Sequence, residues 1–379
     1  MVKVSFRSRE CPQLRTALRW RAWIFLTAAT CSVIMTHCVH AQSRLEPQAY
    51  VPHHVSAPES APYLLSDGYI YIAGNDLVAP FLKKVNALFL KDHPGFKFKM
   101  EPTSSEESIA GIISGKSAFG VTARDVTFID KAAFQSLYGY AVTDIQFGWD
   151  NTPDADHFPP NGKFPPAIWV NAKNPISALT LEQLTSILMT GSAHGDITRW
   201  GQISFDEAPI GKNGGDYAKR EIHVYLPALH GLPVISTDRI RLGGGLAWTR
   251  RAEYLPLMED VVNAVANDPF GIGMTGWFPG DEGWDRQTEL GSKVRLLPLS
   301  IDSESRISHG GPGDLYPLSG GLHLLINHAP GKPVEPWLRE YVRLVLSKEG
   351  QGMLASMTKT NGFIPLKPDE VAVEMDKLK

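Results

Sequence analysis

Polar residues follow three short apolar segments in the first third of the chain, and their side chains are the first candidates for chemistry. These candidates are Asn75, Asp76, Ser104, Ser105, Thr122, Arg124 and Asp125. Hydroxyl, amide, carboxylate and guanidinium groups of this kind hold a small ligand through hydrogen bonds. The pattern therefore indicates ligand binding at the ends of three structural elements.

The segments around these residues alternate between the sequence patterns of strands and helices. We expect strands at residues 69–73, 96–100 and 118–122, and helices at residues 78–89 and 104–113. Strands that alternate with helices form a parallel sheet, whose ligands lie beyond the carboxyl ends of the strands. The turns 74–76, 103–107 and 122–125 should therefore converge on one cleft.

The N-terminal residues 1–41 have the pattern of a secretory signal. Three arginines precede an apolar run at residues 23–35, and Val39-His40-Ala41 has the small-residue spacing of a signal-peptidase site. A membrane anchor is the alternative, but this run is shorter than the ~20 residues that span a bilayer. We expect the remaining chain to be secreted or periplasmic.

Charge and cysteine content limit the possible partners of the exported chain. Without residues 1–41, which hold six basic residues and one acidic residue, 31 Lys and Arg remain against 39 Asp and Glu, a net charge of −8. A nucleic-acid or anionic-membrane partner would require a basic face instead. All cysteines lie within residues 1–41, so no disulfide or thiolate metal site is expected, and no other residue spacing suggests a metal centre.

The exported part is long enough for two lobes of ~150 residues each. Residues 42–62 contain prolines and little apolar periodicity, so an unstructured leader is expected before the first lobe. At the other end of the chain, apolar residues at helical spacing predict a closing helix over residues 335–355.

Several further segments share their order and spacing with a known family. They are the helix up to His93-Pro94-Gly95, residues 109–120 before Arg124, residues 174–184 leading to 197–200, residues 267–273, residues 316–319, and residues 346–351 with 362–365. Together they resemble the substrate-binding proteins of bacterial phosphate importers, a branch of the periplasmic binding proteins. The resemblance extends over residues 69–366.

The resemblance implies an α/β fold of the two-lobed periplasmic-binding-protein type II class, with mixed, mainly parallel sheets and a hinge of crossing strands. Lobe 1 would comprise residues 63–166 and 316–379, and lobe 2 residues 167–315. It further implies that phosphate lies on helix N-termini between the lobes, held by backbone N–H groups, hydroxyls, an Arg and an Asp. The expected partners are a small oxyanion and an ABC permease. We expect a monomer that binds no cofactor, metal or nucleic acid.

The candidate turns depart from the family pattern. Asn75 and Asp76 stand where the family has hydroxyl side chains, and Glu106 and Glu107 add carboxylates to a turn that is Gly- and Ser-rich in the family. A carboxylate close to a dianion repels it. The alternative is structural, because Ser104-x-x-Glu107 is also the pattern of a capping box that starts a helix.

The fourth family turn is the least similar. Where the family has an Arg and a Gly-Ser-Gly-Thr turn, the candidate ligand residues His230 and Gly231 precede Leu232-Pro233-Val234, which lack hydroxyls. Each hydrogen bond to a charged group contributes ~1.5–3 kcal/mol, so losing three or four would abolish tight phosphate binding unless other groups replace them. Arg239, Arg241 or Arg250 could do so. A changed or lost ligand therefore stands beside phosphate as a hypothesis.

An exported hydrolase is a further alternative. Residues 309–313, His-Gly-Gly-Pro-Gly, resemble an oxyanion-hole loop, but no serine has the Gly-x-Ser-x-Gly spacing of the nucleophile that such an enzyme needs. We therefore interpret this loop as a surface turn. The sequence favours a binding protein without catalytic residues over an enzyme.

Overall fold

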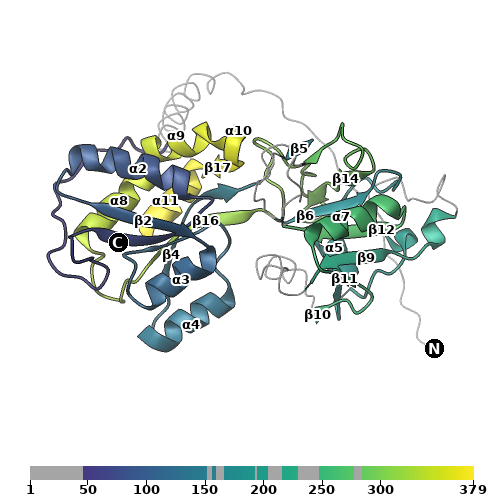
Figure 1. The fold of residues 1–379 in the computed structure, drawn as a ribbon, viewed down its shortest axis with the longest axis horizontal. Helices are drawn as coiled ribbons and strands as arrows, with labels where there is room; N and C mark the ends of the chain where they lie inside the picture. Colours follow the sequence, from purple (N-terminus) through teal and green to yellow (C-terminus); the bar gives the residue numbers. More distant parts are fainter. Residues whose placement is uncertain are drawn as a thin grey trace, which may run out of the picture. The chain divides into compact units, whose positions relative to one another are not determined.

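A computed structural model describes residues 46–151, 156–158, 166–192, 194–203, 216–228, 247–276 and 284–379. The predicted signal and two predicted ligand residues, His230 and Gly231, lie outside these ranges. Within the described residues the protein is α/β, with helices packed on two larger sheets (Figure 1). The predicted fold class, with mixed sheets, is confirmed.

The first sheet contains six strands. In spatial order they are β17 (Phe363–Pro365), β4 (Thr143–Asp150), β16 (Gly320–Ile326), β3 (Gly120–Thr122), β1 (Ile70–Asn75) and β2 (Phe98–Thr103). Strand β1 runs parallel to β2 and β3, as the alternation of strands and helices predicted. Strand β16 comes from late in the chain and runs antiparallel to both β3 and β4. Parallel pairing in this sheet is thus confined to the strands that precede residue 123.

In the chain, a helix follows β1 and another follows β2. Helix α2 (Ala79–Asp92) buries Phe81, Leu82, Val85 and Phe89 on one face, which is the face that the apolar spacing predicted. Pro80 lies in its first turn, where the missing N–H removes no helical hydrogen bond. The other helices around this sheet are α3 (Ser105–Ile113), α4 (Phe128–Tyr138), α8 (Pro336–Leu346), α9 (Lys348–Ser356), α10 (Thr358–Asn361) and α11 (Pro368–Asp376).

The prediction of a single closing helix over residues 335–355 is wrong. The structure divides it into α8 and α9 at Ser347, whose extended backbone ends one helix and whose hydroxyl accepts a hydrogen bond from Gly350 N at 3.2 Å. A serine in this role satisfies an amide at the start of the second helix. The local cap therefore interrupts an apolar pattern that is otherwise continuous.

The second sheet contains five strands. In spatial order they are β11 (Glu253–Leu255), β9 (His223–Pro227), β12 (Gly271–Thr275), β6 (Ala167–Asn171) and β14 (Val294–Leu296). Helices α5 (Leu181–Leu188) and α7 (Met258–Asn267) accompany it, with the short helices η1 (Trp200–Gln202) and η2 (Tyr217–Lys219). Helix α5 starts with a capping box, in which Thr180 and Gln183 exchange hydrogen bonds. The remaining strands form the pairs β8 (Met189–Thr190) with β10 (Ala247–Trp248), β5 (His157–Phe158) with β13 (Trp284–Asp285), and β7 (Leu179–Thr180) with β15 (Leu299–Ser300).

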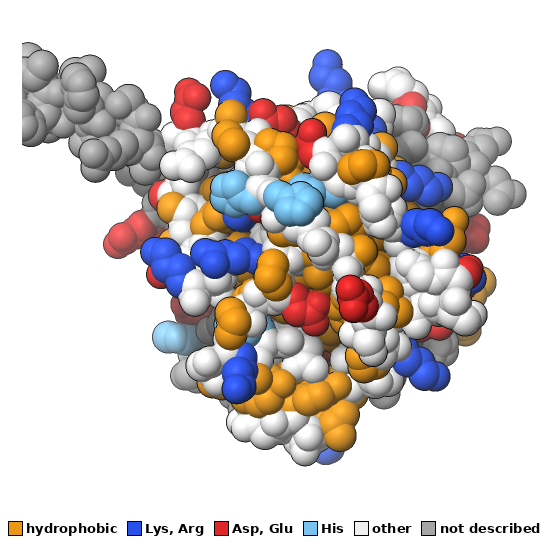
Figure 2. Space-filling model, turned by 90° about the vertical axis from the view of Figure 1, so that its left-hand side faces the viewer, with side chains coloured by type: hydrophobic (Ala, Val, Ile, Leu, Met, Phe, Trp, Pro, Cys, Tyr) orange, Lys and Arg blue, Asp and Glu red, His pale blue; other side chains and the backbone are white. Residues whose placement is uncertain are grey.

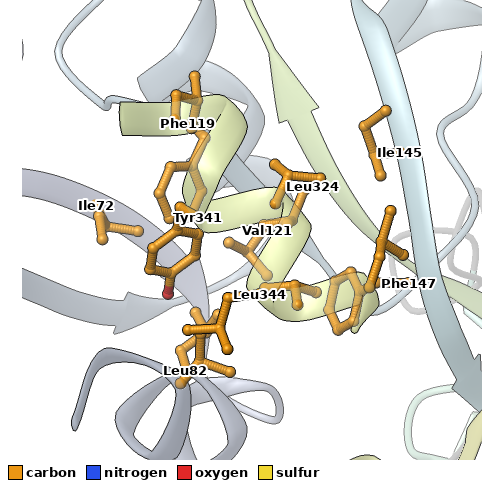
Figure 3. Packing of buried hydrophobic residues seen from close by; sticks show 14 of the residues in the cluster. Ile72, Leu82, Phe119, Val121, Ile145, Phe147, Leu324, Tyr341 and Leu344 are labelled. Atoms are coloured by element: carbon orange, nitrogen blue, oxygen red, sulfur yellow. The ribbon is translucent and has the colours of Figure 1, made fainter. Parts of the chain in front are cut away.

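Each larger sheet has its own hydrophobic core. In the core of the first sheet, Val121, Phe147 and Leu324 from three strands point toward Tyr341 and Leu344 of α8 (Figure 3). The core of the second sheet includes Trp169, Trp200 and Met274. Because burial of large apolar side chains is the main favourable contribution to folding, two separate cores mean two separately stabilised sheets.

The chain passes from one core to the other within a few residues. Tyr316 and Leu318 are buried in the core of the second sheet, whereas Leu322 and Leu324 belong to the core of the first. The chain between β4 and β6 joins the same two sheets in the opposite direction. These connections agree with the crossing strands that the resemblance implied.

No helix among the described residues is long and apolar enough to cross a membrane. The face shown in Figure 2 carries Lys and Arg side chains interspersed with Asp, Glu and hydrophobic ones. On this face, therefore, basic residues do not form a continuous patch.

Candidate functional site

The three candidate turns meet at one edge of the first sheet, which confirms their predicted convergence, and the cleft stays a prediction. Asn75 lies opposite Thr103 in the register of β1 and β2, and Gly74 lies opposite Val121 of β3. Across the turns, Asn75 Nδ2 donates to Ser105 Oγ at 3.1 Å and Ala123 N donates to the same oxygen at 3.3 Å. A single serine hydroxyl thus connects the ends of β1 and β3 to the start of α3.

The hydroxyl group of Ser105 has a proton available for a hydrogen bond. Its oxygen accepts both hydrogen bonds just described, so its own proton must point elsewhere, and no acceptor for it is found among the described residues. The residue is only 5% exposed. A hydroxyl that is fixed by two donors and retains its proton is suited to binding a ligand oxygen.

Ser104 is the N-cap of α3. Its hydroxyl accepts a hydrogen bond from Glu107 N at 3.2 Å, which confirms the structural role that was the alternative to ligand binding. The reciprocal bond of a full capping box, from the Ser104 backbone to the Glu107 side chain, is not found among the described residues. Ser104 therefore starts the helix that carries Ser105.

Asn75 and Asp76 shape the first turn. The Oδ1 atoms of both accept from Leu77 N, at 2.9 and 3.0 Å. Asp76 N donates to Thr103 O at 3.3 Å, which connects the first turn to the second. Their side chains close the turn locally, as side chains of Asn and Asp commonly do.

Thr122 and Asp125 hold the third turn in place. Thr122 is fully buried and its hydroxyl donates to Arg124 O at 2.8 Å, so its proton is used inside the turn. The Asp125 carboxylate accepts from Gly321 N of β16 at 2.7 Å. The third turn is thereby fixed to a strand nearly two hundred residues later in the chain.

Arg124 is buried and paired with two carboxylates. Its Nη1 lies 2.6 Å from Asp130 Oδ2, and its Nε lies 3.2 Å from Glu106 Oε1. Asp130 also caps α4 by accepting from Thr127 N at 2.9 Å. Although burial opposes ionisation of Asp130, the hydrogen bond and charge of Arg124 outweigh it and lower the pKa of that carboxyl. Both Arg124 and Asp130 are therefore charged at neutral pH.

His323, on β16, was not predicted from the sequence. Its Nδ1 lies 2.6 Å from Asp144 Oδ1, and its Nε2 lies 3.6 Å from Asp125 Oδ1. Burial favours the neutral ring, but the two carboxylates outweigh burial and raise the pKa of His323 to about 9. The signal that could have revealed this residue is a lone histidine in an apolar strand. Its partners could not be inferred, because they are distant in sequence.

Asp150, at the end of β4, was also missed. Strands β4 and β3 both run antiparallel to β16, so they point in the same direction. Asp150, the last residue of β4, therefore lies at the same edge of the sheet as the candidate turns. Its carboxyl is buried, Oδ1 has no hydrogen-bond partner among the described residues, and burial raises its pKa well above the usual range. It lies beside Asn151, whose amide nitrogen donates to Gly311 O and Asp314 O, both at 3.0 Å.

The glycine-rich loop at residues 309–313 is a turn held by polar contacts. Asp314 accepts from His309 N at 2.9 Å, and Gly310, Gly311 and Gly313 adopt positive φ angles. Such angles suit glycine and explain the composition of the loop without catalysis. Elsewhere among the described residues, no group of three or more His, Cys, Asp and Glu side chains is arranged to hold a metal ion.

Comparison with known proteins finds similarity to phosphate-binding proteins. The sequence is 24% identical over 319 residues to the phosphate-binding protein PstS of Pseudomonas aeruginosa PAO1, covering 80% of this chain and 85% of that protein. PstS of strain UCBPP-PA14 of the same species gives the same values. This match confirms the resemblance predicted from the sequence.

The chain is also similar to solved structures of phosphate-transport proteins. An ABC-type phosphate transport receptor from Vibrio cholerae is 16% identical, with a TM-score of 0.45 and coverage of 78% of this chain and 99% of that one. PstS from Borrelia burgdorferi is 15% identical, with a TM-score of 0.46 and coverage of 78% and 98%. No protein-family model matches the chain.

Proposed function

We propose that this chain, a divergent relative of the phosphate-binding proteins, is the extracytoplasmic solute-binding component of an ABC importer and binds a small oxyanion. It would be exported by the signal at residues 1–41. The ligand would lie between a lobe of residues 63–166 and 316–379 and a lobe of residues 167–315. A membrane permease would be its partner, and the protein would act as a monomer.

The observation that carries this proposal is the sequence match to phosphate-binding proteins over 80% of the chain. The site is consistent with it, because the ends of β1, β2 and β3 bring together the hydroxyl of Ser105 and the N-terminus of α3. Donors of this kind stabilise an oxyanion. The named relatives are binding proteins, which supports a binding role over an enzymatic one.

In this proposal the candidate residues have different roles. Ser105 contacts the ligand directly, with further contacts from His230 and Gly231 in the opposite lobe. Arg124 is a second direct contact, through the Nε–H that Glu106 can release to the ligand. The other candidates maintain the turns that place Ser105, because their side chains already bond within those turns or, for Asp125, to β16. They are Asn75, Asp76, Ser104, Thr122 and Asp125.

One observation favours a changed ligand within the same function. The Glu106 carboxylate lies on Arg124, so the second turn contributes negative charge where the related proteins are expected to contribute neutral donors. An oxyanion of lower charge than the phosphate dianion, or another solute, would suffer less repulsion there. Calorimetry separates these ligands.

The test is calorimetric titration of the exported chain with inorganic phosphate. We expect binding in the micromolar range or tighter, and we expect Ser105→Ala to weaken it by about 10- to 100-fold, because one charge-assisted hydrogen bond contributes ~1.5–3 kcal/mol. Ser114→Ala is the matched control, since Ser114 lies at the other end of α3 and its hydroxyl donates to Gly111 O. No heat at millimolar phosphate would rule out phosphate and leave the changed ligand.

A further inference from the structure

We propose that Glu106 is a specificity-determining residue, a tethered carboxylate that competes with a bound oxyanion for the guanidinium of Arg124. The inference rests on the proposed function and goes beyond it, because it identifies the residue that sets how strongly this chain binds a dianion. Its basis is the unequal way in which two carboxylates hold one arginine.

The first carboxylate, Asp130, is a permanent partner of Arg124. Its side chain is 13% exposed, its oxygens accept from both terminal nitrogens of the guanidinium, at 2.6 and 3.4 Å, and it also caps α4. Removing it would leave a buried cation without its closest counter-charge. Asp130 therefore fixes the orientation of Arg124.

The second carboxylate, Glu106, is an exchangeable partner. It makes a single contact with Arg124, from Oε1 to Nε at 3.2 Å, and its side chain is 72% exposed whereas that of Arg124 is 4% exposed. Pairs with one exposed member are screened by water and contribute little to stability. Glu106 can thus rotate into solvent without disturbing the arginine, and it leaves the Nε–H available to another anion.

The position of Glu106 makes the competition specific. It directly follows Ser105, whose free hydroxyl proton is the donor assigned to the ligand, and it lies in the first turn of α3. An oxyanion that bonds to Ser105 therefore approaches the negative charge of Glu106. The anion must either displace Glu106 from Arg124 or bind beside it at a cost that rises with the charge of the anion.

Glu107 provides an internal control for this inference. It is the next residue of the same helix turn, carries the same charge and is exposed, but its side chain is not among the partners of Arg124. General attraction between a carboxylate and the helix N-terminus applies to both residues. A difference between the two substitutions therefore reports the contact with Arg124.

The experiment is a titration of the exported chain and its Glu106→Gln and Glu107→Gln variants with inorganic phosphate at about pH 8, where phosphate is mainly a dianion. We expect Glu106→Gln to bind phosphate about tenfold more tightly than the parent, and Glu107→Gln to remain within about twofold. Thermal unfolding of all three proteins confirms that each is folded. Binding by Glu106→Gln when the parent shows none would support the inference in its strongest form.

Three results would overturn it. If the parent binds phosphate and Glu106→Gln binds it equally or more weakly, Glu106 does not compete for Arg124, while the proposed function stands. If none of the three proteins binds phosphate, the proposed phosphate site and the role of Glu106 both fail. An equal gain for Glu106→Gln and Glu107→Gln would replace competition at Arg124 with a general charge effect.

Discussion

At the scale of single residues, the environment of His323 determines the charge of its buried ring. It lies between Asp144 and Asp125, and it connects the core of the sheet to the third candidate turn. With a pKa raised to about 9, the buried ring carries a positive charge at neutral pH. The charge of Asp125, which the sequence assigned to a ligand, is in the structure balanced by this histidine.

This charge makes stability depend on pH in a defined direction. The pKa of His323 in the folded protein, about 9, exceeds the ~6.5 of an unfolded chain, so protonation stabilises the fold fully below pH ~6.5 and this contribution is lost as pH rises to about 9. We expect His323→Gln to remove this contribution, which amounts to about 3 kcal/mol at most. Urea unfolding at pH 6, 7.5 and 9 measures it.

The quantity to compare is the difference in free energy of unfolding between the parent protein and His323→Gln at each pH. The difference in free energy of unfolding should be largest at pH 6 and should shrink toward pH 9, since other titrating groups are common to both proteins. A difference that stays constant with pH would mean that the ring contributes through packing and not through its charge.

At the scale of structural elements, β16 makes close contact with the third turn of the candidate site. Gly321 N donates to Asp125 at 2.7 Å, and a side chain at Gly321 would overlap the imidazole ring of His323. Gly320, its neighbour, lies against the backbone of Arg124. Gly320 therefore allows β16 to approach the turn closely, and Gly321 leaves room for the ring of His323.

We expect Gly321→Ala to destabilise the protein by about 2–3 kcal/mol, because the added methyl must displace a buried, ion-paired ring. Urea unfolding at neutral pH measures the effect. Gly95→Ala is the matched control, since nothing lies within 4 Å of its added methyl group, and it should change stability by less than about 0.5 kcal/mol. Equal stability of the two variants would contradict the close packing of the His323 ring against Gly321.

Elements whose determinants are close in sequence could be predicted, and those that depend on distant partners could not. The strands β1, β2 and β3 and the caps at Ser104 and Thr180 follow from local patterns. The break at Ser347 was missed because one capping hydrogen bond outweighs a continuous apolar pattern. The contribution of β16 to the site was missed because His323 and Asp144 are 179 residues apart in sequence.

The same reason limits what the sequence revealed of the site. The convergence of Asn75, Ser105 and Ala123 followed from the rule that parallel strands end at one edge. Sequence reasoning predicted Arg124 as a ligand residue but could not place Glu106 and Asp130 on it, because both pairings depend on side-chain geometry across turns. Polar residue types thus indicated where the candidate turns meet, and only the contacts show which of their side chains already bond within the protein.

At the scale of the whole molecule, the segment before the first strand is attached to the end of the chain. Residues 47–62 contain no helix or strand, yet Lys348 N donates to Gln48 O at 2.9 Å and Tyr50 N donates to Glu349 at 2.6 Å. His53 N donates at 2.9 Å to Glu340, whose side chain is 2% exposed. The segment therefore covers part of α8 and α9 although it has no regular structure of its own.

Removing this segment should destabilise the first sheet. We expect a chain that begins at residue 61 to lose about 2–4 kcal/mol relative to one that begins at residue 47, because three backbone hydrogen bonds and the packing of Tyr50, Val55 and Ala57 against the core are lost together. Urea unfolding of both proteins measures the difference, and the chain that begins at residue 42 is the control for the contacted segment. Identical midpoints for all three would mean that the segment is a passive linker, whereas a lower midpoint for the shortest chain alone would make residues 47–60 part of the folded domain.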